Sequence, residues 1–117
     1  MRKTHFLVFS NPVEGCEDAF NAWYDKHVTD ISRVAGFASA QRFVMDEERS
    51  ESPGGARRYL ALYEIDGGIA EALAALRAAA DAGAVERPDP TCVAGDIFSQ
   101  VFHPVGERYV AGESVEP

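Results

Sequence analysis

The stretch Tyr59-Leu60-Ala61-Leu62-Tyr63-Glu64-Ile65-Asp66-Gly67-Gly68 carries the clearest strand pattern in the chain. It is short, rich in β-forming residues, and closed by an Asp-Gly-Gly turn signal. The alanine-rich segment that follows, from Ile69 to Ala82, predicts a helix because alanine has the highest intrinsic helix propensity. Its apolar residues mark one stripe: Ile69, Leu73, Leu76 and Ala80.

Two strands and one helix are predicted before this stretch. The apolar segment from His5 to Ser10 ends at the turn signal Asn11-Pro12 and predicts the first strand. From about Cys16 to Val34 the apolar side chains recur at steps of three and four, which predicts a long helix. Gly36 has the position of a C-terminal helix glycine, and the segment from Phe37 to Met45 predicts the second strand.

A fourth strand is predicted from Ile97 to Phe102, and the charged, glycine-containing segment from Asp46 to Ala56 is expected to be an exposed loop. The resulting order, β-α-β-β-α-β, predicts an α+β, ferredoxin-like domain. In that fold, a four-stranded antiparallel sheet carries two helices on one face. We expect residues 1–104 to form this domain and residues 105–117 to form a polar C-terminal tail.

The strands carry apolar residues at both parities, as Leu60 and Leu62 do against Tyr59 and Tyr63. Since the helices cover only one face, we expect a second copy of the sheet to cover the other and form a homodimer. The alternative interpretation is a twisted sheet with an apolar edge.

Composition and charge narrow the class of protein. The 117 residues are 46% hydrophobic and 26% charged, which is typical of one globular domain. Acidic residues outnumber Lys and Arg by 19 to 11, and the net charge of −8 argues against a nucleic-acid partner. No apolar run reaches the roughly 18 residues that span a bilayer, and no signal-peptide pattern is present. We therefore expect a cytoplasmic protein without a membrane partner.

The first predicted helix carries the residues most informative for chemistry. His27 lies near Trp23, Tyr24 and Asp30 at helical spacing, within the apolar stripe. A partly desolvated histidine facing the sheet is a candidate base near neutral pH. Asp30 could orient its imidazole, and Tyr24 could donate to a developing oxyanion. The alternative is a structural histidine at the edge of the core, bonded to a backbone carbonyl or to Asp30.

Other candidates lie on the strands. Arg42 would suit a carboxylate or enolate, although a strand arginine can equally point to solvent. Phe20, Trp23 and Tyr63 are expected to shape a cavity for a small hydrophobic or aromatic ligand. The histidines are dispersed, without a Cys or carboxylate at ligand spacing, so no metal is expected. No glycine-rich nucleotide-binding pattern is present, and chemistry without a cofactor is predicted.

Several of these residues together resemble a known family, the EthD-like members of the dimeric α/β-barrel superfamily. The resemblance covers His5 to Pro104 and is carried by Asn11-Pro12, Phe20, Trp23-Tyr24, His27, Gly36-Phe37 and the aromatic strand Tyr59 to Ile65. It implies a pocket in each protomer between the sheet and the first helix, with His27 in the position of the family's helix histidine. The superfamily includes polyketide cyclases, cofactor-free monooxygenases, lactone isomerases and haem-degrading enzymes.

Two positions depart from the family's pattern. Thr29 stands where such sequences often have a proline shortly after the histidine, and Ala35 stands where a proline often precedes Gly-Phe. We therefore expect a less kinked helix end, and a different presentation of His27.

The leading hypothesis is an enzyme that acts on an aromatic or polyketide-like carbonyl compound by cofactor-free acid/base chemistry, and hence a lyase, cyclase or isomerase. His27 would be the base, with Asp30 orienting it. Tyr24 or Arg42 would stabilise the oxyanion. A cofactor-independent monooxygenase would use the same pocket. The further alternatives are a non-catalytic module that holds a hydrophobic ligand and, third, a haem-binding protein.

Overall fold

The computed structural model describes residues 3–51, 57–112 and 115–116. It confirms the predicted order of four strands and two helices. The elements are β1 (Thr4–Ser10), α1 (Glu17–Ile31), β2 (Phe37–Val44), β3 (Tyr59–Ile65), α2 (Ile69–Asp81) and β4 (Phe98–Phe102). The C-terminal part of the predicted loop, residues 52–56, lies outside the described residues.

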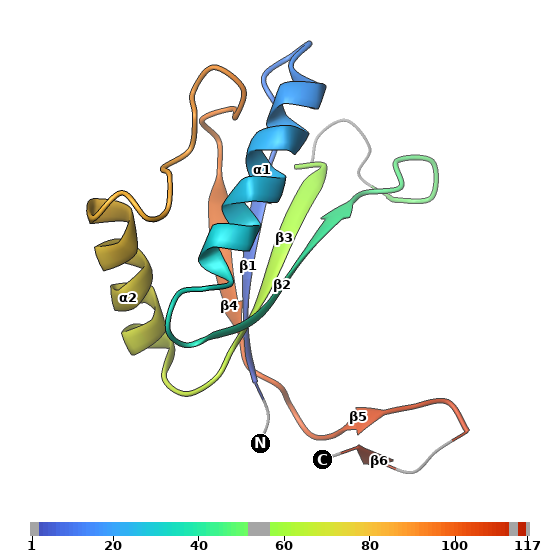
Figure 1. Cartoon of the computed structure of the whole chain (residues 1–117). Coiled ribbons are helices and arrows are strands. Elements are labelled where there is room, and N and C mark those ends of the chain that lie inside the picture. Colours follow the sequence, from blue (N-terminus) through green and yellow to red (C-terminus); the bar gives the residue numbers. More distant parts are fainter. Residues whose placement is uncertain (1–2, 52–56, 113–114, 117) are drawn as a thin grey trace.

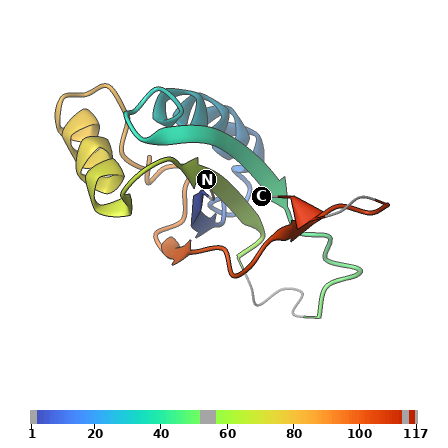
Figure 2. The same ribbon diagram turned by 90° about the horizontal axis from the view of Figure 1, so that it is seen from below.

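The four strands form one antiparallel sheet in the order β2-β3-β1-β4. Both helices lie on the same side of this sheet, as Figures 1 and 2 show from two directions. This α+β arrangement is the ferredoxin-like fold predicted from the element order.

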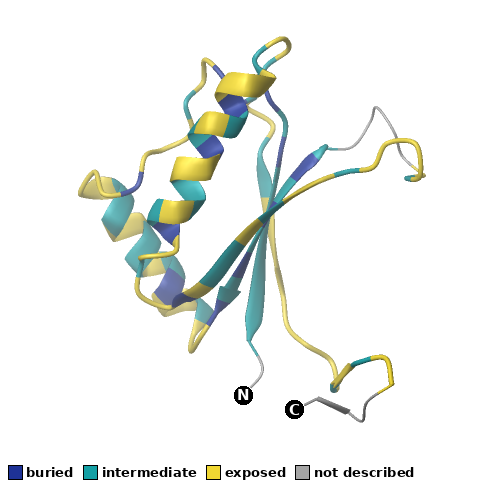
Figure 3. Ribbon diagram, turned by 45° about the vertical axis from the view of Figure 1, so that its right-hand side comes forward, coloured by how far each residue is buried: buried dark blue, intermediate teal, exposed yellow. Residues whose placement is uncertain are grey.

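The side of the sheet that faces the helices holds the core. Along β3 the residues at odd numbers are buried and those between them are half-buried. The register places Phe6 of β1 opposite Tyr63 of β3 on that same side. Figure 3 shows the buried positions between the sheet and the helices. The core consists of Phe20, Tyr24, Ile31, Phe37, Tyr59, Ala61, Tyr63, Ile65, Ala72, Val85, Cys92 and Val93.

The turn between α1 and β2 fits closely against α2. Gly36 has a φ of +93°, and a Cβ added there would lie 3.0 Å from the Cβ of Ala72. Glycine is favoured at such a left-handed position. The register of β2 against β3 then shifts between Phe37 and Ser39. Because of that shift, both Phe37 and the later residue Arg42 face the helices.

The opposite face of the sheet, called the open face below, has no helix over it (Figure 2). The registers place seven apolar side chains there, of which Phe43 and Phe102 are exposed, at 40% and 49%, and the other five are half-buried. They are Leu7, Phe9, Phe43, Leu60, Leu62, Phe98 and Phe102. Apolar side chains thus lie on both faces of the sheet, in agreement with the sequence pattern. That a second copy of the chain covers the open face stays a prediction.

The C-terminal segment contains a second, two-stranded sheet. Its strands β5 (Arg108–Tyr109) and β6 (Val115–Glu116) pair antiparallel, apart from the four-stranded sheet (Figure 1). Tyr109 is largely exposed. In the described parts of the chain, no helix has the length and apolarity that crossing a bilayer requires.

Candidate functional site

The predicted site residues of α1 lie on two sides of this helix. Glu17 and Asp18 stand in its first turn, where carboxylates interact favourably with the helix dipole. Phe20, Tyr24 and Ile31 are buried against the sheet. Trp23 lies on the neighbouring flank, where its ring stacks on His27 and its Nε1 atom bonds Glu86 of the long loop after α2.

Arg42 of β2 closes the interface between α1 and the sheet. Its guanidinium lies over the rings of Phe20, Tyr24 and Tyr59, with its carbon 5.0–5.6 Å from their centroids. It donates to the Asn21 side-chain oxygen at 2.7 Å and to the Asp25 carboxylate at 2.9 Å. Such a half-desolvated arginine over aromatic faces stabilises the packing.

The space between α1 and the sheet is therefore filled by side chains. Phe20 is fully buried, and Tyr63 is 1% exposed, in ring contact with Phe6 and Phe37. Arg42 and the aromatic rings around it occupy most of the space in which the resemblance implied a pocket, and a hollow of about 200 Å³ lies at its edge, beside Asn21, Arg42 and Tyr59. Phe20 and Tyr63 belong to the core.

Burial also changes the acidity of the two tyrosines. Desolvation raises the pKa of Tyr24 above its ordinary value, against smaller opposing effects of the Ser10 hydroxyl and the Arg42 charge. Desolvation raises the pKa of Tyr63 far more strongly. Both phenols are therefore neutral at physiological pH and are poor proton donors in a reaction.

The ring of His27 contacts two aromatic neighbours on α1 and interacts with Glu86, in the loop that follows α2. Its ring stacks on Trp23 at 4.4 Å between centroids and meets the edge of Tyr24 at 5.5 Å. Trp23 Nε1 donates to the carboxylate of Glu86 at 3.2 Å, and Lys26 lies 3.7 Å from the same carboxylate. His27 stands seven residues after Phe20 and four before Ile31, in the same helical stripe as these buried residues, and its orientation toward the sheet stays a prediction.

The imidazole of His27 is neutral at physiological pH. Desolvation lowers its pKa from 6.5 to about 4, while Asp30 and Glu86 act in the opposite direction. Its Nδ1 atom is buried and has no hydrogen-bond partner among the described residues. A buried nitrogen without a partner has lost its bond to water, so this atom is a position where a small polar group could bind.

Asp30 does not orient the imidazole as predicted. Its carboxylate accepts a bond from Lys26 at 2.7 Å and pairs with Arg33 at 3.5 Å. The bond from Lys26 is the main reason that the pKa of Asp30 lies below its ordinary value. Since Lys26 is one turn away on the same helix, this ion pair forms locally, and Asp30 influences His27 only through its charge.

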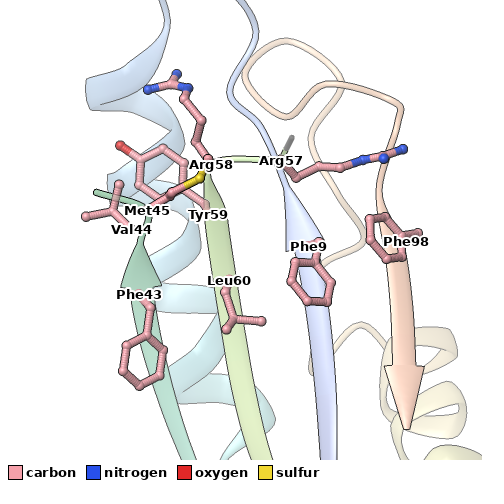
Figure 4. Close-up of a pocket in the computed structure, with 9 residues that line it drawn as sticks. All are labelled: Phe9, Phe43, Val44, Met45, Arg57, Arg58, Tyr59, Leu60 and Phe98. Carbon is pink, nitrogen blue, oxygen red and sulfur yellow. The ribbon is translucent and has the colours of Figure 1, made fainter. Parts of the chain in front are cut away.

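A pocket of about 410 Å³ lies on the open face of the sheet. Phe43, Leu60, Phe9 and Phe98 stand side by side across the four strands and form its floor (Figure 4). The rings of Phe9 and Phe98 are stacked at 4.8 Å. At one end are Val44, Met45, Arg57, Arg58 and Tyr59. Its size and apolar lining fit a small organic ligand.

Sequence reasoning did not find this pocket. It predicted an apolar open face, but it assigned the whole of that face to a second copy. One feature of the sequence could have indicated it. The pair Arg57-Arg58 stands directly before β3, in which Leu60 lies on the open face. The partners Phe9, Phe43 and Phe98 follow only from the registers of three strand pairs.

The described residues also line hollows elsewhere on the protein. One of about 420 Å³ lies between the end of α1 and α2, where Asp30 and Arg33 meet alanine side chains. Another of about 200 Å³ lies beside Arg42 and Tyr59. Across the described ranges, no three His, Cys, Asp or Glu side chains are grouped in a way that could hold a metal ion.

Comparisons with known proteins identify the fold of the chain, but neither its family nor its activity. No protein-family model matches the chain, and no curated protein does. Among solved structures, PA3566 from Pseudomonas aeruginosa aligns with a TM-score of 0.63 at 8% identity, over 91% of this chain and 97% of that one. Protein SO0527 from Shewanella oneidensis gives 0.60 at 17% identity, over 88% and 91%.

A third similar structure has a described activity. SnoaB from Streptomyces nogalater, a cofactor-independent oxygenase, aligns with a TM-score of 0.54 at 14% identity, over 97% of this chain and 100% of that one. These likenesses are consistent with the ferredoxin-like fold. At these identities they describe the fold alone.

Proposed function

We propose that this protein binds a small aromatic or polyketide-like molecule in the pocket on its open face. The observation that carries the proposal is the continuous apolar floor of Phe9, Phe43, Leu60 and Phe98 beneath a hollow of about 410 Å³. Burying a flat ring there removes apolar surface of both partners from water, which stabilises the complex.

We further propose that the protein is an EthD-like member of the superfamily and works as a homodimer. A second copy over the open face would cover Leu7, Leu62 and Phe102, which the single chain leaves half-buried or exposed. It would also close the free side of the pocket and strengthen ligand binding by excluding water.

Binding of a neutral fluorescent probe, N-phenylnaphthylamine, tests the proposed pocket. We expect saturable binding to the wild-type protein with one probe per chain. Replacing Leu60 by Arg places a charge in the floor, and burying that charge against the probe is costly. The Leu60→Arg variant should therefore bind the probe at least about tenfold more weakly, a loss of about 1.4 kcal/mol.

Leu62→Arg is the matched control. Leu62 lies on the same strand and the same face but does not line the pocket. Compared with the wild-type protein in the same assembly state, which light scattering measures, this variant should keep the probe affinity within about twofold. A loss of affinity that accompanies a change of assembly state would reflect the proposed dimer and not the pocket. Equal losses in both variants would show that the probe binds the open face at large, which contradicts a defined pocket.

A second candidate function, acid/base catalysis by His27, is favoured by one observation. Its neutral imidazole has a buried Nδ1 without a partner in the described structure. The loop residue Glu86 contacts Trp23 and Lys26 through its half-exposed carboxylate and His27 through its backbone, and access of a substrate to the buried Nδ1 requires a movement of the surrounding side chains or of this loop. A base whose pKa is about 4 could remove a proton only from an acidic carbon, such as that between two carbonyl groups.

Proton exchange measures this activity directly. In deuterated water, the wild-type protein should accelerate deuterium uptake at the central carbon of an aromatic β-diketone. His27→Gln should reduce that rate by about 100-fold or more, the usual contribution of a general base. Asp18→Asn, at an exposed position in the first turn of the same helix, serves as the control. An exchange rate that His27→Gln leaves unchanged removes His27 as the base.

A further inference from the structure

One arginine at the end of the open-face pocket is held rigidly over an aromatic ring. The guanidinium carbon of Arg57 lies 4.5 Å from the centroid of Phe98. Its Nε donates to the backbone carbonyl of Asp96 at 2.8 Å and lies 3.6 Å from that residue's carboxylate. Figure 4 shows this side chain above Phe98, beside the row of rings. The position of the charge is therefore fixed before any ligand arrives.

The terminal nitrogens of Arg57 remain as donors. A guanidinium carries five N–H groups, and Asp96 occupies only the one on Nε. Among the residues that the structure describes, no partner bonds the two terminal nitrogens of this side chain. They form the flat fork that matches a carboxylate or sulfonate.

The neighbouring arginine differs in this respect. Arg58 pairs with two carboxylates, Glu17 at 3.5 Å and Glu47 at 3.7 Å, so its charge is compensated from two sides. Arg57 has a single carboxylate neighbour at 3.6 Å. With a net charge of −8, the protein as a whole repels anions. An anion that binds here must therefore be recognised by a specific local contact, and Arg57 offers it.

We infer that the pocket selects an aromatic anion, whose ring lies on the floor of Phe9, Leu60 and Phe98 and whose acidic group binds the terminal nitrogens of Arg57. This inference rests on the proposed function, because it names the chemical class that the same pocket takes. A carboxylate, an enolate or a phenolate attached to a flat ring would satisfy both contacts, since each presents oxygen acceptors in the plane of the ring.

Two matched probes separate the inference from the proposal on which it rests. Anilinonaphthalene sulfonate has nearly the aromatic skeleton of N-phenylnaphthylamine and adds an anionic group. Replacing Arg57 by Gln should weaken binding of the anionic probe by about tenfold, as expected for a hydrogen bond to a charged group. The affinity for the neutral probe should change by less than about twofold, because the floor is intact.

Arg87→Gln is the control for the loss of a surface charge, since Arg87 also pairs with one aspartate, Asp81, and lies outside the pocket. If Arg87→Gln loses as much affinity for the anionic probe as Arg57→Gln does, the probe is attracted by positive charge in general, and the inference is overturned. If Arg57→Gln binds the anionic probe as tightly as the wild-type protein does, the inference about Arg57 is overturned as well, while the proposed pocket stands. If neither probe binds the wild-type protein, or if binding disappears as the chain dimerises, the proposed pocket fails.

Discussion

Replacing Phe20 by Ala should lower the free energy of unfolding by about 3–5 kcal/mol, the usual cost of removing a buried phenylalanine. Phe20 is 0% exposed, and its ring lies 4.8 Å from that of Tyr59 and 5.3 Å from that of Tyr24. The cavity would also remove one of the three rings beneath the Arg42 guanidinium. Because small domains are stable by only about 5–15 kcal/mol, this change brings the protein close to unfolding.

Urea denaturation followed by circular dichroism measures the effect. Val105→Ala is the matched control, because Val105 is 98% exposed and the change should stay within about 0.5 kcal/mol. A loss below about 1 kcal/mol in Phe20→Ala would mean that the helix and sheet do not pack through this ring.

Lowering the pH from 6.5 to 4 should destabilise the protein through His27. The folded state depresses its pKa from 6.5 to about 4, so within this range the unfolded chain binds the proton more readily. The stability that neutral His27 contributes is complete above pH 6.5 and is lost as the pH falls toward 4. At about 1.4 kcal/mol per pKa unit, and allowing for the partial exposure of the ring, the loss is about 2–3 kcal/mol.

The His27→Gln variant isolates this effect, because glutamine does not titrate. Its unfolding free energy should change less between pH 6.5 and 4 than that of the wild-type protein. Carboxylates whose pKa is lowered by folding through other partners, such as Glu17 and Asp89, contribute stability that is lost mainly at lower pH, and they do so equally in both proteins. Parallel curves for the two proteins would contradict a neutral, desolvated imidazole.

The fold could be predicted because each element has a local signal. The strand at Tyr59 to Ile65 was predicted to the residue, and the helix at Ile69 ends one residue before its predicted limit. The first helix ends at Ile31, whereas the apolar spacing continued to Val34. The residues after Ile31 form the turn that leads to Gly36, and Val34 extends the apolar spacing because its side chain packs against the core from this turn.

The site could be predicted less well, because it depends on contacts between distant segments. The periodicity grouped Trp23, Tyr24 and His27 correctly on one helix, and the structure brings their rings together. Nothing in that periodicity reveals that the loop around Glu86 covers the flank of the helix. The open-face pocket likewise requires the registers of three strand pairs, which local patterns do not contain.

The order β2-β3-β1-β4 has a consequence during synthesis on the ribosome. The central strand β1 emerges first, yet both of its neighbours are made much later, and β4 comes only at Phe98–Phe102. At about 5–20 residues per second, β1 waits several seconds or more for its last partner. During that interval its two edges and its aromatic side chains are unprotected, so a nascent chain of this protein should be a substrate for chaperones until translation is nearly finished.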